Sequence, residues 1–317
     1  METFWRARKV VIIGAGAVGS TFAYALAQRG AADEICLLDV NHELAIGQVL
    51  DLAHGLPFYP PLQIRVGSKE DYADAQVIVM TAGAKQAPGE TRLELLQRNA
   101  QIVSAVVDDI VAQNSSAVLV MVTNPVDVLT YLALRRSGWE SGRVLGSGTV
   151  LDSARFRYLL SRHCQVDVTN IHAYVLGEHG DSEVAAWSMT HIAGVPMDEY
   201  CPTCHRCSNW PLERERIAQA VRDSAYHIIN YKGATYFGIG MALVRIVSAI
   251  LQDQNSVLTV STLLDGEYGL RDVCLGVPAV VGQRGVERIV IAPLSAEEQQ
   301  ALERSAETLR EQIAGLG

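Results

Sequence analysis

Three closely spaced glycines and one later carboxylate give the clearest chemical signature in the chain. Gly14, Gly16 and Gly19 follow a short apolar, β-branched run in G-x-G-x-x-G spacing, and residues 17–29 then have a helical pattern. The glycines permit a sharp turn, backbone approach to a pyrophosphate, and close packing of the helix. Asp39 ends a second apolar run twenty residues after Gly19, where an acid suits ribose hydroxyls and repels an extra phosphate. The stretch predicts an NAD site; a strand–turn–helix unit without a ligand is the alternative.

A histidine in a polar loop is the main candidate for proton transfer. His179 lies in the loop 176–181 between two glycines, and imidazole titrates near neutral pH. Asp152 and Arg155 are three residues apart in a helical pattern, so they share a helix face. A carboxylate can hold the second ring nitrogen of a histidine, and a guanidinium suits bidentate binding of a carboxylate. Taken alone, a histidine is more often structural and an arginine more often solvates a surface.

Strands and helices alternate up to about residue 145, and they must position these groups. Repeated βα units predict a doubly wound parallel sheet with right-handed crossovers. Ligands then bind beyond the carboxyl ends of the strands, so we expect the loops after Ile13, Asp39, Thr81 and Val122 to line the site. The expected helices are 17–29, 43–54, 92–113 and 126–137, and the expected strands are 10–13, 35–38, 62–66, 76–81, 117–122 and 144–145.

The second half of the chain has a different pattern, in which helices alternate with a loop and short strands. It predicts an α+β substrate domain over 147–317, following a dinucleotide-binding domain over 1–146. A closing helix is expected to begin after Ser295, where Ser-Ala-Glu-Glu resembles a capping box. The other expected helices are 150–163, 212–231 and 237–252, and the expected strands are 171–175, 257–262, 271–275 and 287–291.

The composition is that of a globular protein. The chain has 317 residues, of which 49% are hydrophobic and 19% charged, and it is long enough for two domains or one large one. Its formal net charge of -9 argues against non-specific binding to nucleic acid or to a membrane surface. No apolar run reaches the length of a membrane span, and the first strand leaves no room for a signal peptide. We therefore expect a cytoplasmic protein without nucleic-acid or membrane partners.

Three of the six cysteines cluster in one short segment. Cys201, Cys204 and Cys207, together with His205, have spacing that resembles a metal knuckle, so a structural zinc is one possibility. The segment also fits a c-type haem pattern, but haem attachment would require export. We favour a thiol-rich surface loop without a metal, and the sequence leaves the role of these cysteines open.

Six motifs together resemble the lactate/malate dehydrogenase superfamily over essentially the whole chain. Within it, the chain is most similar to the bacterial L-lactate dehydrogenases. The resemblance implies a Rossmann domain that binds NAD, followed by a substrate domain. We expect no bound metal. The motifs are GAGAVGS (14–20), TAGAKQAPGETR (81–92), TNPVDV (123–128), GSGTVLDSARFR (146–157), YVLGEHGDSEV (174–184) and KGATYFGIG (232–240).

The resemblance implies reversible hydride transfer between NADH and pyruvate, giving L-lactate and NAD, as in glycolysis and pyruvate fermentation. His179 is then the proton donor and acceptor, and Asp152 fixes its tautomer. Arg155 binds the substrate carboxylate. Arg92 follows a loop that closes as a lid in this superfamily, which brings the arginine to the substrate carbonyl.

Other positions match residues that line the pocket in that superfamily. Asn124 is implied near the substrate carbonyl, with a cis bond to Pro125. Thr235 is implied at the substrate and Ile239 at the nicotinamide. The positions implied for cofactor binding are Gly14, Gly16, Ala17, Val18, Gly19, Asp39, Thr81, Ala82, Gly83, Val122, Asn124 and Ile239.

Gln86 separates the closest alternatives. Malate dehydrogenases carry arginine at this lid position, which pairs with the second carboxylate of oxaloacetate, and lactate dehydrogenases carry glutamine. A neutral Gln86 leaves that carboxylate unpaired in a closed site, and Thr235 adds bulk to the same pocket. A malate or other 2-hydroxyacid dehydrogenase is the alternative. A non-catalytic NAD-binding protein is another, which the presence of all four of His179, Asp152, Arg155 and Arg92 argues against.

Regulation is implied by the resemblance alone. Many bacterial relatives are homotetramers (dimers of dimers) that fructose 1,6-bisphosphate activates by binding between subunits. Their phosphate-binding arginine and histidine match Arg157 and His172. Arg157 lies two residues after Arg155, so it faces away from the substrate arginine on a helix. The alternative is that both are surface residues near a subunit contact.

Overall fold

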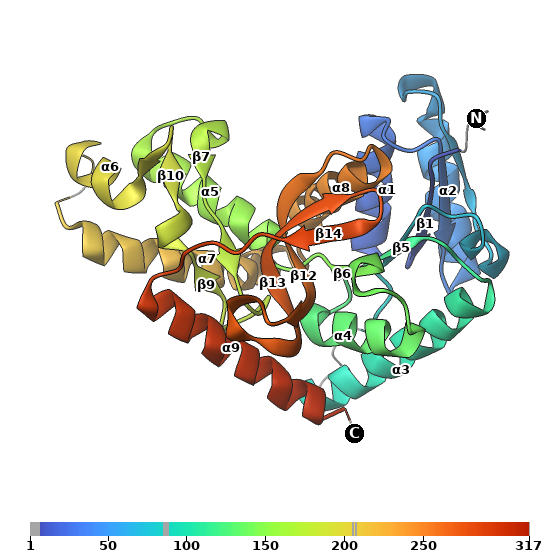
Figure 1. Cartoon of the computed structure of the whole chain (residues 1–317). Coiled ribbons are helices and arrows are strands. Elements are labelled where there is room, and N and C mark those ends of the chain that lie inside the picture. The colour runs from blue at the N-terminus through green and yellow to red at the C-terminus, as the bar shows by residue number, and fades with distance from the viewer. Residues whose placement is uncertain (1–6, 85–88, 205, 207, 317) are drawn as a thin grey trace, which may run out of the picture.

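The computed structural model describes residues 7–84, 89–204, 206 and 208–316. Figure 1 shows the course of the chain. The strands of the first half are β1 (Lys9–Ile13), β2 (Glu34–Leu38), β3 (Gln63–Val66), β4 (Val77–Met80), β5 (Val118–Met121) and β6 (Val144–Gly146). Its helices are α1 (Ala17–Arg29), α2 (His42–His54), α3 (Arg92–Ala112) and α4 (Val126–Ser137).

These six strands form a parallel sheet in the order β6-β5-β4-β1-β2-β3. They are short and mostly apolar on both faces, as expected of strands covered by helices on each side. The order reverses between β1 and β4, which is the arrangement of a dinucleotide-binding sheet with its ligand crevice at the reversal. The predicted doubly wound parallel sheet is confirmed.

The second half extends the same sheet and adds a separate lobe. The antiparallel strands β12 (Ser256–Asp265), β13 (Arg271–Gly282) and β14 (Gly285–Ile289) continue the sheet from β6, where Ser261 pairs with Gly146. The remaining helices are α5 (Val150–Cys164), α6 (Met197–Cys204), α7 (Trp210–Lys232), α8 (Phe237–Leu251) and α9 (Ala296–Ala314), and the short strands are β7 (Ile171–His172), β8 (Val175–Leu176), β9 (Val184–Ala185), β10 (His191–Ile192) and β11 (Val195–Pro196).

Three apolar clusters hold these elements together. Helices α1, α2 and α8 cover one face of the sheet, and α3, α4 and α9 cover the other. A third cluster joins α5, α6 and α7 in the lobe at the left of Figure 1. Because α5 begins beside the sheet and ends in this lobe, it links the two halves of the molecule.

Two expectations about local structure have clear outcomes. Ser295 accepts a hydrogen bond from the amide of Glu298, whose carboxylate accepts one from the Ser295 amide, so the predicted capping box is confirmed. The expected thiol-rich surface loop is wrong for Cys201 and Cys204, because both lie in α6 and Cys201 is fully buried. Cys207 and His205 lie outside the described residues. None of the helices in the described ranges has the length and apolar character needed to cross a bilayer.

Candidate active site

The glycine loop after β1 packs against the loop after β4. Gly14 has a φ of +106°, and a Cβ there would lie 2.7 Å from the backbone nitrogen of Ala82. A Cβ at Gly19 would lie 1.9 Å from the carbonyl oxygen of Gly14. The Thr81 hydroxyl donates to the Ile13 carbonyl over 2.9 Å. Both glycines are therefore required by the close approach of backbone to backbone.

Gly16, the middle glycine of the loop, and Asp39, the acid after β2, are placed as a bound dinucleotide would require. A Cβ at Gly16 would meet nothing within 4 Å, so the loop leaves open space where α1 begins. No acid lies in the first turn of α1, whose N-terminus therefore stays favourable for a phosphate. One oxygen of Asp39 accepts the Ala15 amide over 2.7 Å, which holds this carboxylate beside the glycine loop.

A buried asparagine ties together the loops after β4 and β5. Asn99, on α3, accepts a hydrogen bond from the Ala84 amide over 2.8 Å and donates to the Asn124 carbonyl over 2.9 Å. The Thr123 hydroxyl donates to the Ala82 carbonyl over 2.7 Å. The Asn124–Pro125 bond is cis, as the resemblance implied. Asn99 was missed by sequence reasoning, although a lone amide on an apolar helix face was a possible signal.

The centre of the candidate site is a carboxylate shared by an imidazole and a guanidinium. Asp152 lies in the first turn of α5 and is almost fully buried. One of its oxygens is 2.6 Å from Nδ1 of His179, and the other accepts a hydrogen bond from Arg155 over 2.7 Å. The structure therefore brings together the three residues that the loop and helix patterns had singled out.

A second buried acid fixes the backbone of the histidine loop. The carboxylate of Asp127, on α4, accepts the backbone N–H of His179 over 2.8 Å. Burial raises the pKa of Asp127 to about 6. Sequence reasoning did not single out this residue, because nothing local relates it to a histidine more than fifty positions away.

The two carboxylates control the charge of His179. Burial by itself would lower the pKa of His179, but the adjacent Asp152, supported by Asp127, raises it to about 9. Burial opposes ionisation of Asp152, yet His179 and Arg155 keep its pKa below the usual range. At neutral pH the centre therefore holds an imidazolium next to a carboxylate, and the imidazolium can give up one proton.

A cavity of about 720 Å³ opens beside this centre. His179, Asn124 and Arg92 line it, together with Asp181 and Tyr226. Arg92 begins α3, is 85% exposed at its side chain, and lies 3.7 Å from the carboxylate of Asp181. Gln86, which precedes it in the expected lid, lies outside the described residues.

The other expected pocket residues are distributed over two regions. Val18, Val122 and Ile239 are partly buried and pack against the same apolar cluster of the sheet. Ala17 begins α1 next to the glycine loop. Gly83 leaves no space for a side chain, because a Cβ would lie 2.6 Å from the Thr123 methyl group. Thr235 is partly buried in the short connection between α7 and α8.

The expected effector residues lie on neighbouring elements of the lobe. Arg157, on α5, is partly buried and donates to the Ser153 carbonyl over 3.3 Å. Burial lowers the pKa of Arg157, and the nearby Arg245 acts in the same direction. His172 is exposed on β7, where it pairs with His191 of β10.

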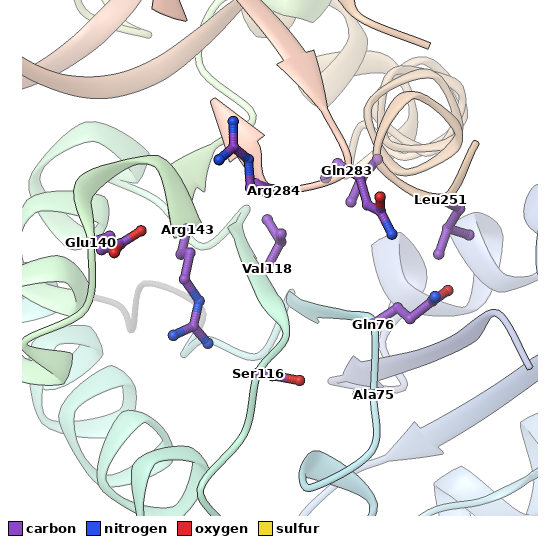
Figure 2. A pocket seen from close by; sticks show the side chains of 10 residues that line it. Ala75, Gln76, Ser116, Val118, Glu140, Arg143, Leu251, Gln283 and Arg284 are labelled. Carbon is purple, nitrogen blue, oxygen red and sulfur yellow. The ribbon is translucent and has the colours of Figure 1, made fainter. Parts of the chain in front are cut away.

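Two other clusters of polar side chains already have partners within the protein. A cavity of about 390 Å³ lies where β4, β5 and β6 begin, lined by Gln76, Ser116 and Arg143 (Figure 2). Its Arg143 is already bonded to two backbone carbonyls and lies over the Trp139 ring. Within the described residues, Glu34, Cys36 and Asp71 lie close enough to share a cation. Their carboxylates already pair with arginine and lysine side chains.

The dinucleotide-binding sheet and the adjacent carboxylate–imidazole pair define an NAD-dependent oxidoreductase. Comparison with known families agrees and is more specific. Residues 8–146 match the NAD binding domain of lactate/malate dehydrogenase, and residues 149–316 match its alpha/beta C-terminal domain. The chain belongs to the lactate/malate dehydrogenase family, and NAD, the expected cofactor, is confirmed.

Relatives and solved structures cover nearly the whole chain. The L-lactate dehydrogenase of Treponema denticola is 59% identical over 305 residues, covering 96% of each chain. That of Acetivibrio thermocellus is 50% identical, covering 98% of this chain and 97% of the relative. A lactate dehydrogenase from a Medee basin deep-sea metagenome has a TM-score of 0.96 at 43% identity, covering 98% of this chain and 99% of the other. The minor L-lactate dehydrogenase of Enterococcus mundtii, ligands bound, has a TM-score of 0.95 at 42% identity with the same coverage.

Proposed function

We propose that the chain is an L-lactate dehydrogenase that interconverts pyruvate and L-lactate with NADH and NAD. The observation that carries this proposal is the shared Asp152 carboxylate, which holds His179 and Arg155 side by side next to a dinucleotide-binding sheet. The names of the relatives support the same activity.

In the proposed reaction each residue has a separate task. When bound, NADH would supply the hydride that reduces pyruvate. His179 delivers its proton to the carbonyl oxygen, and Asp152 stabilises the imidazolium before transfer and holds the ring in place. Arg155 binds the substrate carboxylate through its planar guanidinium. In lactate oxidation neutral His179 accepts the hydroxyl proton.

Arg92 and the lid complete the proposed site. Arg92 lines the cavity, its side chain is largely exposed, and its guanidinium lies 3.7 Å from the carboxylate of Asp181. Closure of the lid would exclude water and bring this cation to the carbonyl oxygen, where negative charge develops. Gln86 would then face the variable end of the substrate and favour a methyl group over a second carboxylate.

Coenzyme binding is proposed at the loops that the sheet reversal brings together. The backbone of Gly14 to Gly19 and the start of α1 would hold the pyrophosphate. Asp39 would accept hydrogen bonds from ribose hydroxyls and repel a 2′-phosphate. Thr81, Ala82, Gly83, Val122, Asn124 and Ile239 would line the path to the nicotinamide.

The chain's surface supports association into a proposed homotetramer, a dimer of dimers. Tyr24, Leu50, Phe237 and Met241 are large apolar side chains that stand exposed on α1, α2 and α8. A groove of about 600 Å³ runs between these helices, and an exposed apolar surface of this kind is typical of a subunit contact. We also propose that fructose 1,6-bisphosphate activates the enzyme by binding at Arg157 and His172. The proposed location is the cytoplasm, and the proposed domains span residues 1–146 and 147–317.

One assay tests the activity and its alternatives. NADH oxidation is measured with pyruvate, oxaloacetate and a branched 2-oxo acid, and NADPH replaces NADH in a parallel series. The proposal expects the highest kcat/KM with pyruvate and NADH. A preference for oxaloacetate would indicate a malate dehydrogenase, and no turnover with any 2-oxo acid would indicate a non-catalytic member of the family.

A further inference from the structure

The last turn of α6 brings two thiols together at the edge of the lobe. Cys201 and Cys204 are both present as thiols, three residues apart on one helix. Cys201 is fully buried, whereas Cys204, the last residue of the helix, is partly exposed. The Cys204 thiol donates to the Cys201 carbonyl over 3.2 Å. A reagent in solution can therefore reach Cys204 before it reaches Cys201.

A histidine and a carboxylate stand behind the buried thiol. Nε2 of His163, at the end of α5, lies 3.4 Å from the sulfur of Cys201. On its other side, Nδ1 of His163 lies 3.6 Å from a carboxylate oxygen of Glu213 on α7. This order places an imidazole nitrogen, which can accept a proton, beside the Cys201 sulfur, and a carboxylate on the far side of the same ring.

The helix end allows the two sulfurs to join. Residues three apart on a helix have Cβ atoms about 5–6 Å apart, and a disulfide needs about 3.5–4.5 Å between them. Only a small closure is required, and it falls on the terminal residue of a short helix. Pro202 has no backbone N–H to donate within this helix. The side chains of Thr203 and Cys204 donate hydrogen bonds to the backbone carbonyls of Tyr200 and Cys201. Rearranging Cys204 therefore breaks few regular helical bonds.

We propose that Cys201 and Cys204 form a reversible redox site that hydroperoxides oxidise to a disulfide. The Cys204 thiolate attacks the peroxide, the O–O bond breaks, and Cys204 becomes a sulfenic acid with release of water. His163 then takes the Cys201 proton, the Cys201 sulfur attacks the Cys204 sulfur, and the hydroxyl group leaves as water with that proton. Two thiols and one hydrogen peroxide give one disulfide and two waters.

The test uses the full chain treated with hydrogen peroxide and then with an alkylating agent. Trypsin leaves residues 163–206 as one peptide, because they contain no lysine or arginine before Arg206, and this peptide holds Cys164, Cys201 and Cys204. We expect this peptide to carry one alkyl group instead of three and to lack the mass of two hydrogens, to accept the two missing alkyl groups after dithiothreitol, and to show the bond between Cys201 and Cys204 on fragmentation. The same loss should persist in Cys164→Ser and vanish in Cys204→Ser.

Two further variants separate the proposed roles. In Cys201→Ser, Cys204 should stop at the sulfenic acid and react with dimedone. In His163→Gln, closure of the disulfide should slow about tenfold, because an unassisted thiol is only a few per cent thiolate at pH 7. Cys274→Ser, in β13, is the matched control and should oxidise like the unaltered chain. Loss of the mass change in Cys164→Ser, or a disulfide that includes any other cysteine, would overturn the proposal.

Discussion

Asp152 is the residue on which the charges of the site depend. Its two oxygens serve different cations, one His179 and one Arg155, from a position that water hardly reaches. Asp152 already balances the positive charge of His179. A substrate carboxylate that binds Arg155 would therefore add a second negative charge near the imidazolium. The acid sets both the protonation state of His179 and the orientation of the arginine.

The pKa of His179 predicts opposite pH profiles for the two directions. It is raised to about 9, so the proton needed for pyruvate reduction is present below that value and is lost as pH rises through it. We expect kcat/KM for pyruvate to be level near neutrality and to fall above about pH 9, and kcat/KM for lactate to rise towards pH 9. Steady-state kinetics from pH 6 to about 10 measure both.

The variant Asp152→Asn tests whether the Asp152 carboxylate raises the pKa of His179. Without the carboxylate, burial dominates and lowers the pKa of His179, so the fall in pyruvate kcat/KM should move below about pH 7.

His179→Ala should lower turnover by about 10²-fold or more while NADH still binds. Near-normal pyruvate turnover by His179→Ala would rule out the proposed proton transfer.

Gln86→Arg should move specificity towards a dicarboxylate. The new cation would pair with the second carboxylate of oxaloacetate and would stand unpaired beside the methyl group of pyruvate. We expect the ratio of kcat/KM for oxaloacetate to that for pyruvate to rise by about tenfold or more, since one charged hydrogen bond contributes about 1.5–3 kcal/mol. An unchanged ratio would mean that residue 86 does not face the substrate's variable end.

At the scale of elements, substitutions at two glycines of one loop should affect different properties, one the stability of the fold and the other coenzyme binding. A Cβ at Gly19 would overlap the Gly14 carbonyl, whereas a Cβ at Gly16 meets open space. Gly19→Ala should lower the free energy of unfolding by about 3 kcal/mol through overpacking. Gly16→Ala should leave Tm nearly unchanged and weaken NADH binding, because its methyl group would occupy the space proposed for the pyrophosphate.

Thermal unfolding and NADH fluorescence titration measure these two effects independently. Gly16→Ala is itself the control for Gly19→Ala, since both add one methyl group to the same loop. Equal losses of Tm in the two variants would contradict the packing seen at Gly19. Normal NADH affinity in Gly16→Ala would remove the loop from the proposed coenzyme site.

The elements that sequence reasoning predicted are those with local signals. The glycine spacing, the apolar strands and the helical pairing of Asp152 with Arg155 depend on neighbours in the chain. Asn99 and Asp127 could not be assigned in the same way, because their partners are set by how α3 and α4 pack. Helix α6 was missed since Pro202 and the cysteine spacing favoured a loop, and the extension of the sheet by β12 rests on one distant pairing.

At the scale of the whole molecule, α5 connects the candidate active site with the proposed effector site. Its first turns carry Asp152 and Arg155, and Arg157 follows on another side of the helix. Within the described residues, Arg157 forms no ion pair, and Arg245 lies near it with hydrogen bonds to neutral side chains only. A guanidinium group without a carboxylate partner, whose pKa a second arginine lowers further, favours a nearby anion.

A bisphosphate bound at Arg157 can activate only if it binds one state of the enzyme more tightly than another. We expect fructose 1,6-bisphosphate to lower the apparent KM for pyruvate and to favour the tetramer in sedimentation experiments. Arg157→Gln should weaken this response without lowering kcat at saturating pyruvate. Arg162→Gln, which removes the same charge from an exposed position on the same helix, should respond normally. If pyruvate saturation curves of the unaltered chain superimpose with and without the effector, at acidic and at neutral pH, the regulation fails while the dehydrogenase activity can still hold.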